Sequence, residues 1–370
     1  MAVSAFCCGD FIPSSKFNLD SVCRVVVYFS PCHSQYTNKI WRYRKLITLE
    51  GISKTFLVAK RQPGIRHAVK SLFHREYTAV DALQDISFSI APGEIVGYIG
   101  PNGAGKSTTI KVMSGILVPD RGACVIDGFT PWKDRVPFVK NIGVVFGQRS
   151  QLWWDVPVLD SFELLRDIYD VPEAQYKETL TLLVEALDLG AIIHTPVRQL
   201  SLGQRMRCEI AASLLHSPRI LFLDEPTIGL DAVSKIAVRQ FIKKINKEKG
   251  VTVILTTHDM NDIEALASRI LLIGKGKLLY DGSVQGLRSR FGTKRTITAD
   301  YHENGKPLHI PGAELLSWTP ERAILGVDTE QVMISEAITR LSAQVELLDV
   351  AVETQPIEDI IVQMYKEYRL

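Results

Sequence analysis

The sequence has no long hydrophobic run. A membrane-spanning helix needs roughly 18 consecutive apolar residues, and the richest apolar stretches, residues 251–255 and 270–273, are far shorter. These two stretches are typical of buried strands. If the protein works at a membrane, we therefore expect another chain to cross it.

An excess of either charge is also missing. Lysine and arginine number 43 and aspartate and glutamate 41 among 370 residues, of which 46% are hydrophobic. This balance gives no indication of a nucleic-acid partner or of binding to an anionic bilayer surface. The length is sufficient for two compact domains.

Cysteines spaced as metal ligands are absent as well. Of the six cysteines, four lie in the first tenth of the chain without the paired spacing of a zinc module: Cys7, Cys8, Cys23 and Cys32. The other two, Cys124 and Cys208, are predicted to be core thiols of a protein in a reducing compartment.

Residues 1–45 show no sustained helical or strand period and form an N-terminal extension. They could be a targeting segment, a poorly ordered tail, or sequence upstream of the true start codon. A basic insert, residues 60–75, is either a solvated loop or a docking segment. The tight turn at residues 91–93 predicts that the strands on either side of it pair with each other.

From residue 46 to residue 290, strands and helices alternate in the manner of an α/β domain. The predicted strands are residues 46–49, 79–90, 94–99, 142–146, 220–223 and 251–256, and the predicted helices are residues 161–169, 173–189, 204–216 and 232–247. After a boundary at Gly292 and Thr293, residues 293–370 are predicted to form a small C-terminal α/β domain. That domain could bind a regulator or support a dimer.

The motif with the clearest chemistry lies between a predicted strand and a predicted helix. It consists of Gly100, Pro101, Asn102, Gly103, Ala104, Gly105, Lys106 and Ser107, followed by Thr108. Glycines allow successive backbone N–H groups to surround an anion at a helix N-terminus, where the helix dipole also favours negative charge. Lys106 can neutralise phosphate oxygens, and the Ser107 hydroxyl can bind Mg²⁺, which prefers oxygen ligands. The motif predicts a phosphate loop for a magnesium nucleotide.

Two carboxylates, Asp224 and Glu225, follow the buried strand at residues 220–223. Ligands of open α/β sheets bind at the carboxyl ends of the strands. We expect Asp224 to hold Mg²⁺, directly or through water, and Glu225 to act as the general base on the attacking water.

A third motif makes the resemblance to a family specific. Ser201, Leu202, Gly203 and Gln204, preceded by Leu200, open a predicted helix and resemble the signature motif of the ATP-binding cassette (ABC) family. In that family the serine and the glycine contact the γ-phosphate bound to the opposite subunit, so the resemblance implies a dimer, in the simplest case a homodimer. Leu202 stands where the family usually has glycine. This departure puts in question the close approach of the backbone to the nucleotide, whereas the serine and the second glycine are kept.

The remaining landmarks of the family occur in the expected order. The resemblance implies that Gln148 senses Mg²⁺ and water, that Asp231 crosses the dimer interface, and that His258 hydrogen-bonds the γ-phosphate. It also implies an aromatic ring stacked on adenine, for which Phe56 and Tyr77 compete, with Tyr77 slightly favoured.

The resemblance covers about residues 46–290. It implies an α/β phosphate-loop NTPase core with an antiparallel β subdomain and a helical subdomain at about residues 152–199, with ATP and Mg²⁺ as cofactors. Trp153 and Trp154 belong either to the core or to a contact with a permease. The basic insert, the signature variant and the ending at residues 357–360 resemble ATPases of ABC-2 type exporters, which work at the cytoplasmic face of a membrane with separate permease subunits. An importer ATPase and a soluble ABC protein of translation or DNA repair are the alternatives, although one cassette without heptads favours transport.

Overall fold

The computed structural model describes residues 45–59, 77–147, 149–257, 259–292, 294–304 and 306–368. The N-terminal extension and the basic insert lie outside these ranges, except for Lys45, as do Gln148 and His258. Residues 45–370 form one contact unit. In the described ranges, no helix has both the length and the apolarity required to cross a membrane.

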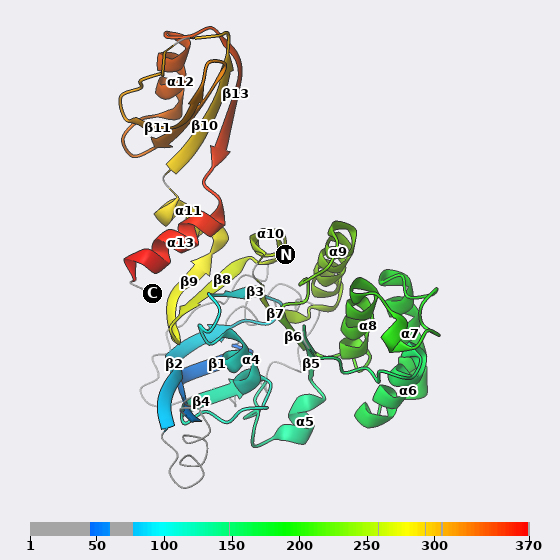
Figure 1. The fold of residues 1–370 in the computed structure, drawn as a ribbon. Coiled ribbons are helices and arrows are strands. Elements are labelled where there is room, and N and C mark those ends of the chain that lie inside the picture. Colours follow the sequence, from blue (N-terminus) through cyan, green and yellow to red (C-terminus); the bar gives the residue numbers. More distant parts are fainter. Residues whose placement is uncertain are drawn as a thin grey trace, which may run out of the picture. The chain divides into compact units, whose positions relative to one another are not determined.

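Strands and helices alternate along the described chain (Figure 1). The elements are β1 (Ile47–Ala59), β2 (Tyr77–Ile90), β3 (Ile95–Ile99), α4 (Lys106–Met113), β4 (Arg121–Ile126), α5 (Arg135–Val139), β5 (Ile142–Phe146), α6 (Val158–Tyr169), α7 (Glu173–Ala186), η2 (Val197–Gln199), α8 (Leu202–Leu214), β6 (Ile220–Asp224), α9 (Ala232–Lys249), β7 (Thr252–Thr256), α10 (Met260–Leu266), β8 (Arg269–Gly274), β9 (Lys277–Ser283), α11 (Val284–Phe291), β10 (Lys294–Tyr301), β11 (Ala313–Thr319), β12 (Arg322–Asp328), α12 (Ile334–Ser342), β13 (Leu347–Thr354) and α13 (Ile357–Glu367). The predicted α/β class is confirmed.

A mostly parallel sheet with strand order β5-β6-β7-β3-β8-β9 carries the motifs. Its inner strands are buried on both faces, as their continuous apolar runs predicted. Successive residues of one strand therefore enter two different cores: Leu221 and Leu223 of β6 enter one, while Ile220 and Phe222 enter the other.

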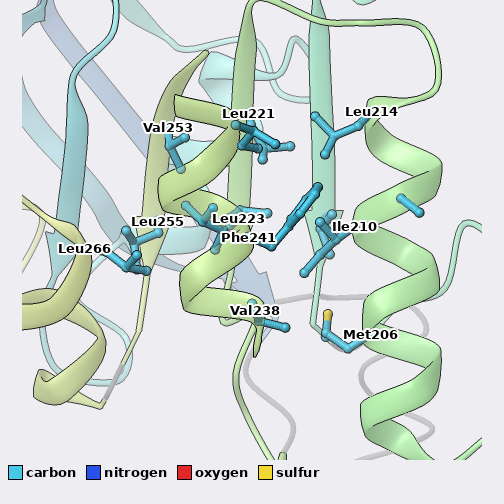
Figure 2. Close-up of a cluster of buried hydrophobic side chains, with 14 of the residues drawn as sticks. Met206, Ile210, Leu214, Leu221, Leu223, Val238, Phe241, Val253, Leu255 and Leu266 are labelled. Atoms are coloured by element: carbon cyan, nitrogen blue, oxygen red, sulfur yellow. The ribbon is translucent and has the colours of Figure 1, made fainter. Parts of the chain in front are cut away.

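The first core lies between this sheet and the helices α8, α9 and α10 (Figure 2). Apolar residues recur at helical spacing on the buried face of α8, and α9 adds its own apolar residues from the side. The side chains that meet there include Met206, Ile210, Leu214, Val238, Phe241 and Leu266. This packing positions the N-termini of α8 and α9, where the signature motif and Asp231 lie.

The second core lies on the other face of the sheet, against α4 and an antiparallel sheet of order β2-β1-β4. The prediction that the strands flanking residues 91–93 pair with each other is wrong. Ile90 at the end of β2 pairs with Ile47 of β1, whereas Ile95 at the start of β3 pairs with Val253 of β7. The turn passes the chain from one sheet to the other, because β3 is apolar on both faces and takes a central place in the parallel sheet.

The C-terminal residues divide between two cores. Strands β11-β12-β10-β13 form an antiparallel sheet that packs one face on α12. The last helix, α13, was grouped with this domain in the sequence analysis, but its apolar side chains Ile357, Ile360 and Met364 belong to the first core of the nucleotide-binding part. Tyr365 of α13 also donates a hydrogen bond of 3.4 Å to the carbonyl of Ile273 in β8.

Candidate active site

The predicted phosphate loop connects the end of β3 to the start of α4. Two of its glycines are required for different reasons. A Cβ on Gly100 would lie 2.5 Å from the carbonyl oxygen of Ile273, whereas Gly103 has open space around it but a φ of +79°. The N–H of Gly276 donates to the carbonyl of Ala104 at 2.9 Å, so the β8–β9 turn holds the loop in place.

Lys106 is 6% exposed, and its ammonium group lies inside the loop. Its Nζ donates to the carbonyls of Gly100 at 2.6 Å and Pro101 at 3.2 Å. Burial lowers the pKa of Lys106, while the nearby carboxylates of Glu225 and Asp224 act in the opposite direction. The carbonyls of Gly100 and Pro101 are neutral acceptors. Phosphate oxygens can replace them and form stronger, charge-assisted hydrogen bonds with Lys106.

Asp224 and Glu225 lie at the carboxyl end of β6, beside the phosphate loop. One oxygen of Asp224 accepts hydrogen bonds from Thr256 Oγ1 at 2.6 Å and from Ser107 Oγ at 3.4 Å. A hydroxyl and a carboxylate at this separation form an oxygen donor set that fits Mg²⁺. Glu225 has a φ of +57°, a strained conformation of the kind that clusters at functional sites.

A cleft of about 310 Å³ beside the phosphate loop is lined by Ser107, Lys111, Ile116, Phe146, Gly147, Arg149, Asp224 and Glu225. The N–H of Gly147 donates to the carbonyl of Asp224 at 2.8 Å, which places the segment after β5 against the acidic strand. Gln148 is the next residue, outside the described ranges.

The signature residues lie at the N-terminus of α8. Ser201 and Gln204 form a capping box, since Ser201 Oγ accepts from the Gln204 N–H at 3.2 Å and Gln204 Oε1 accepts from the Ser201 N–H at 2.9 Å. A Cβ on Gly203 would lie 2.8 Å from Ser234 Oγ. Leu202, the departure from the family pattern, places its Cδ2 2.6 Å from the position that a Cβ on Gly229 would take.

Asp231 caps the neighbouring helix α9. Its carboxylate accepts hydrogen bonds from the N–H and the hydroxyl of Ser234 at 2.9 and 2.8 Å, which lower the pKa of Asp231. The close approach of Gly203 to Ser234 places the N-termini of α8 and α9 side by side. Ser201, Gly203 and Asp231 therefore form one group of residues.

This group does not meet the phosphate loop within one chain. The helix that follows the loop, α4, packs on one face of the parallel sheet, and α8 and α9 pack on the other. In the described ranges, the hydrogen bonds of Ser201 and Asp231 stay within their own helix N-termini and do not reach the phosphate loop.

The two candidate adenine aromatics lie at different distances from the loop. The carbonyl oxygen of Ala82 is 2.6 Å from the position of a Cβ on Gly105, so this part of β2 borders the loop. Phe56 pairs with Val80, which is two residues from Ala82 along β2. Tyr77 is at the start of β2 and lies about 17 Å along the strand from Ala82, at about 3.4 Å per residue. The register favours Phe56.

Sequence reasoning missed two buried acids near the site. Glu209 of α8 accepts hydrogen bonds from Ser150 Oγ and, at 3.1 Å, from the N–H of Gln151. Burial raises the pKa of Glu209, although these hydrogen bonds oppose the shift. The signal was a charged residue on the apolar face of a predicted helix. The second acid, Asp262, lies on α10 and is buried among polar side chains.

Comparison with known proteins identifies relatives of this chain. A family profile described as ABC transporter matches residues 83–228. The chain is similar to the uncharacterized ABC transporter ATP-binding protein YhcH of Bacillus subtilis, with 36% identity over 197 residues that make up 53% of this chain and 63% of YhcH. It is 33% identical over 218 residues to the linearmycin resistance ATP-binding protein LnrL of the same organism, covering 59% of this chain and 70% of LnrL.

A solved structure gives the same result for the fold. The post-hydrolysis dimer of the ATP-binding cassette MJ0796, bound to ADP and Pi, superposes with a TM-score of 0.54 at 27% identity, covering 64% of this chain and 98% of that one. Together with the extent and identity of the match to LnrL, this likeness shows that the chain belongs to the family of ABC transporter ATP-binding proteins.

Proposed function

We propose that this chain is the ATP-hydrolysing subunit of an ABC exporter, which dimerises on ATP and drives separate permease subunits at the cytoplasmic face of a membrane. The observation that carries the proposal is the convergence of Ser107, Asp224 and Glu225 on one cleft, beside the phosphate loop that holds Lys106. The signature residues lie on the opposite face of the sheet, where they would serve a partner's nucleotide.

The phosphate loop and the acidic residues beside it have roles that their positions support. The backbone N–H groups at the start of α4 bind phosphate oxygens, and Lys106 exchanges its loop carbonyls for them. Ser107 and Asp224 hold Mg²⁺, which neutralises phosphate charge when bound. Glu225 removes a proton from the attacking water, and its fixed backbone conformation limits the directions in which its carboxylate can point.

The second copy completes the site in this proposal. Ser201 and Gly203 contact the γ-phosphate held by the partner, and Asp231 lies at the interface beside them. The roles of Gln148 and His258 rest on the family resemblance, because both lie outside the described ranges. For adenine we propose Phe56, which is 38% exposed and nearer to the loop than Tyr77.

Two tryptophans support the coupling to a permease. Trp153 and Trp154 are 40% and 52% exposed, which favours a partner contact over core packing. Their backbone is held firmly, because Trp153 N–H donates to Ser161 Oγ at 3.2 Å and the Arg198 N–H donates to the Trp154 carbonyl at 3.0 Å. A rigid apolar surface of this kind is suited to transmitting the motion of one subunit to another.

Export is favoured over the alternatives by the relatives. LnrL is named for resistance to linearmycin, and YhcH is described as an ABC transporter ATP-binding protein. We therefore place this chain with exporters and not with importers or with factors of translation or DNA repair.

The test combines activity with capture of the partner. Glu225→Gln should still bind ATP and should lose hydrolysis by at least about a hundredfold, whereas Glu248→Gln, on an exposed part of α9, should behave as wild type. Normal turnover in Glu225→Gln would overturn the base assignment. Purification of tagged Glu225→Gln from gently solubilised membranes with ATP should bring down a polytopic membrane protein, and recovery of ribosomes or repair proteins instead would refute the transport role.

A change at the tryptophans separates catalysis from coupling. Trp154→Ala should leave the ATPase activity of the isolated chain unchanged and weaken recovery of the membrane protein. Retention of full recovery would exclude this surface as the permease contact.

A further inference from the structure

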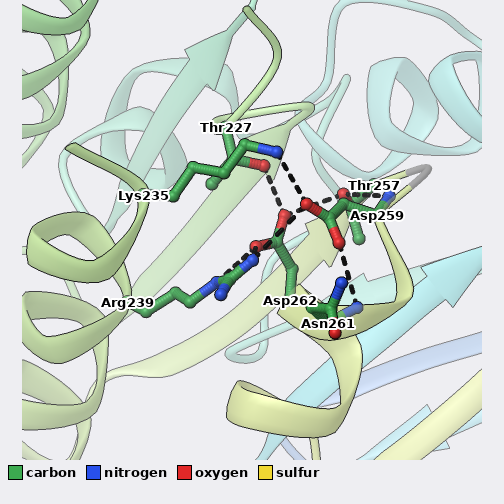
Figure 3. A network of polar contacts seen from close by, with 7 residues as sticks. All are labelled: Thr227, Lys235, Arg239, Thr257, Asp259, Asn261 and Asp262. Atoms are coloured by element: carbon green, nitrogen blue, oxygen red, sulfur yellow. Dashed lines mark hydrogen bonds and ion pairs between the residues drawn. The ribbon is translucent and has the colours of Figure 1, made fainter. Parts of the chain in front are cut away.

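A buried carboxylate joins three segments that surround the proposed base. Asp262 of α10 is fully buried. It accepts hydrogen bonds from Thr227 Oγ1 and, at 2.9 Å, from Thr257 Oγ1, while Arg239 Nε of α9 donates to it at 2.5 Å (Figure 3). Each donor comes from a different part of the chain.

The network extends from Asp262 to a second acid. Asp259 accepts from Lys235 Nζ at 2.7 Å and from Arg239 Nη2 at 3.4 Å, and its N–H donates to Thr257 Oγ1 at 3.0 Å. Two acids and two bases therefore balance in charge (Figure 3). A buried carboxylate is stable only with its partners in place, so displacement of any one segment would leave a charge or a hydroxyl without its bond.

The joined segments are those that carry the proposed chemistry. Thr227 is two residues beyond Glu225, Thr257 and Asp259 stand on either side of His258, and α9 begins directly after Asp231. A cleft of about 270 Å³ lies against the network and is lined by Glu225, Thr227, Ile228, Gly229, Lys235, Thr257 and Asp259. The network thus forms a wall of the space next to the proposed base.

The partners of the phosphate loop are different residues. Lys106 is held by Gly100 and Pro101, and the loop itself is held by Gly276. In the described ranges, the hydrogen bonds of Asp262 and Arg239 go to Thr227, Thr257, Asp259 and each other, and none reaches the loop. Loss of the network should therefore leave the binding of ATP largely intact.

We propose that Asp262, together with Arg239, is a positioning residue for ATP hydrolysis, which aligns the loop after Glu225 with the segment that holds Thr257 and Asp259. Neither residue lines the cleft beside the phosphate loop. The inference rests on the proposed role of Glu225 as the base. It adds that turnover, but not ATP affinity, depends on Asp262 and Arg239, which lie outside the cleft beside the phosphate loop.

The test uses the full-length chain with three variants. Asp262→Asn removes the charge that faces Arg239. Thr257→Val is nearly isosteric, keeps the Asp262–Arg239 ion pair, and removes the hydroxyl that joins both acids. Glu264→Gln is the matched control, because Glu264 lies on the same helix and pairs at 2.5 Å with Arg288, away from the network.

The readouts are kcat and KM for ATP hydrolysis, equilibrium ATP binding and the unfolding midpoint. A displacement of catalytic groups by about 1 Å can cost about a hundredfold in rate. We expect Asp262→Asn and Thr257→Val to lower kcat between about tenfold and a hundredfold and to leave ATP affinity within about twofold. Glu264→Gln should match wild type in all four readouts.

The outcomes are separable. If Asp262→Asn does not fold, Thr257→Val decides the matter, and a folded Thr257→Val with wild-type kcat would overturn the proposal. An equal loss of kcat and of ATP affinity would also overturn it, because the network would then act on the whole fold. Normal turnover in Glu225→Gln would instead refute the proposed base, a distinct result because that variant leaves the network intact.

Discussion

The two glycines of the phosphate loop allow a direct test of why the loop needs them. In Gly100→Ala the new Cβ would lie 2.5 Å from the carbonyl oxygen of Ile273 and 2.7 Å from its Cγ2. Neither atom can move freely, because Ile273 is buried within β8. Overpacking of this kind typically lowers the free energy of unfolding by about 2 kcal/mol.

Gly103→Ala is the matched comparison. Its Cβ would meet nothing within 4 Å, but the φ of +79° is unfavourable for alanine. The left-handed conformation costs about 1–2 kcal/mol, and the reduced freedom of the unfolded chain offsets about 0.4–1 kcal/mol of it. The expected net loss lies between about 0 and 1.6 kcal/mol.

The effect on nucleotide binding should differ more strongly. In Gly100→Ala the loop must move away from β8, which displaces the N–H groups that bind phosphate, so ATP affinity should fall at least about tenfold. In Gly103→Ala the loop keeps its contacts, and the affinity should change less. Urea unfolding and equilibrium ATP binding measure both quantities. Unfolding and binding of Gly100→Ala at wild-type values would refute the close packing of Ile273 on the loop.

Three further predictions concern the helical layer. Burial lowers the pKa of His216 to about 4, below its ordinary value of about 6.5. The unfolded chain therefore takes up a proton first as the pH falls, and the free energy of unfolding should drop by about 3 kcal/mol between pH 6.5 and pH 4. Urea unfolding of His216→Gln should lack this pH dependence. Glu209→Ala should lower the free energy of unfolding by about 2–3 kcal/mol, because Ser150 and the Gln151 N–H lose their acceptor, whereas an unchanged urea midpoint would contradict the buried bonds. Ser201→Ala should lower the free energy of unfolding by about 1 kcal/mol, because the helix cap is lost. It should reduce hydrolysis far more than ATP binding by the monomer. Hydrolysis at the wild-type rate would show that Ser201 does not contact the γ-phosphate.

The chemistry of this protein could be predicted from short contiguous segments. The phosphate loop, the acidic strand and the signature each combine their functional residues with their own strand or helix within about ten residues. Local backbone preferences place such residues at the ends of strands and at the N-termini of helices, whatever the rest of the chain does. For that reason the α/β class and the helices α6 to α9 were also predictable.

Pairing between distant segments was not predictable in the same way. The turn at residues 91–93 has the same sequence character whether it closes a hairpin or passes the chain between two sheets. The burial of β3 on both faces decided the second outcome. The helix α13 has one apolar face that either of two cores could cover, and contacts with α11 and the first core decided which.

Binding and hydrolysis of a magnesium nucleotide could be predicted from the sequence alone, because the required groups lie close together along the chain and local geometry presents them. The folded chain was needed to show that Phe56 is nearer than Tyr77 to the phosphate loop, that α4 and α8 pack in different cores, and that Asp262 joins three segments beside Glu225. These relations depend on contacts between distant segments; the bonds of Asp262 to Arg239 and Thr227, for example, span 23 and 35 positions. They arise from strand register and from the satisfaction of a buried charge, which depend on the whole packed chain and not on any single segment.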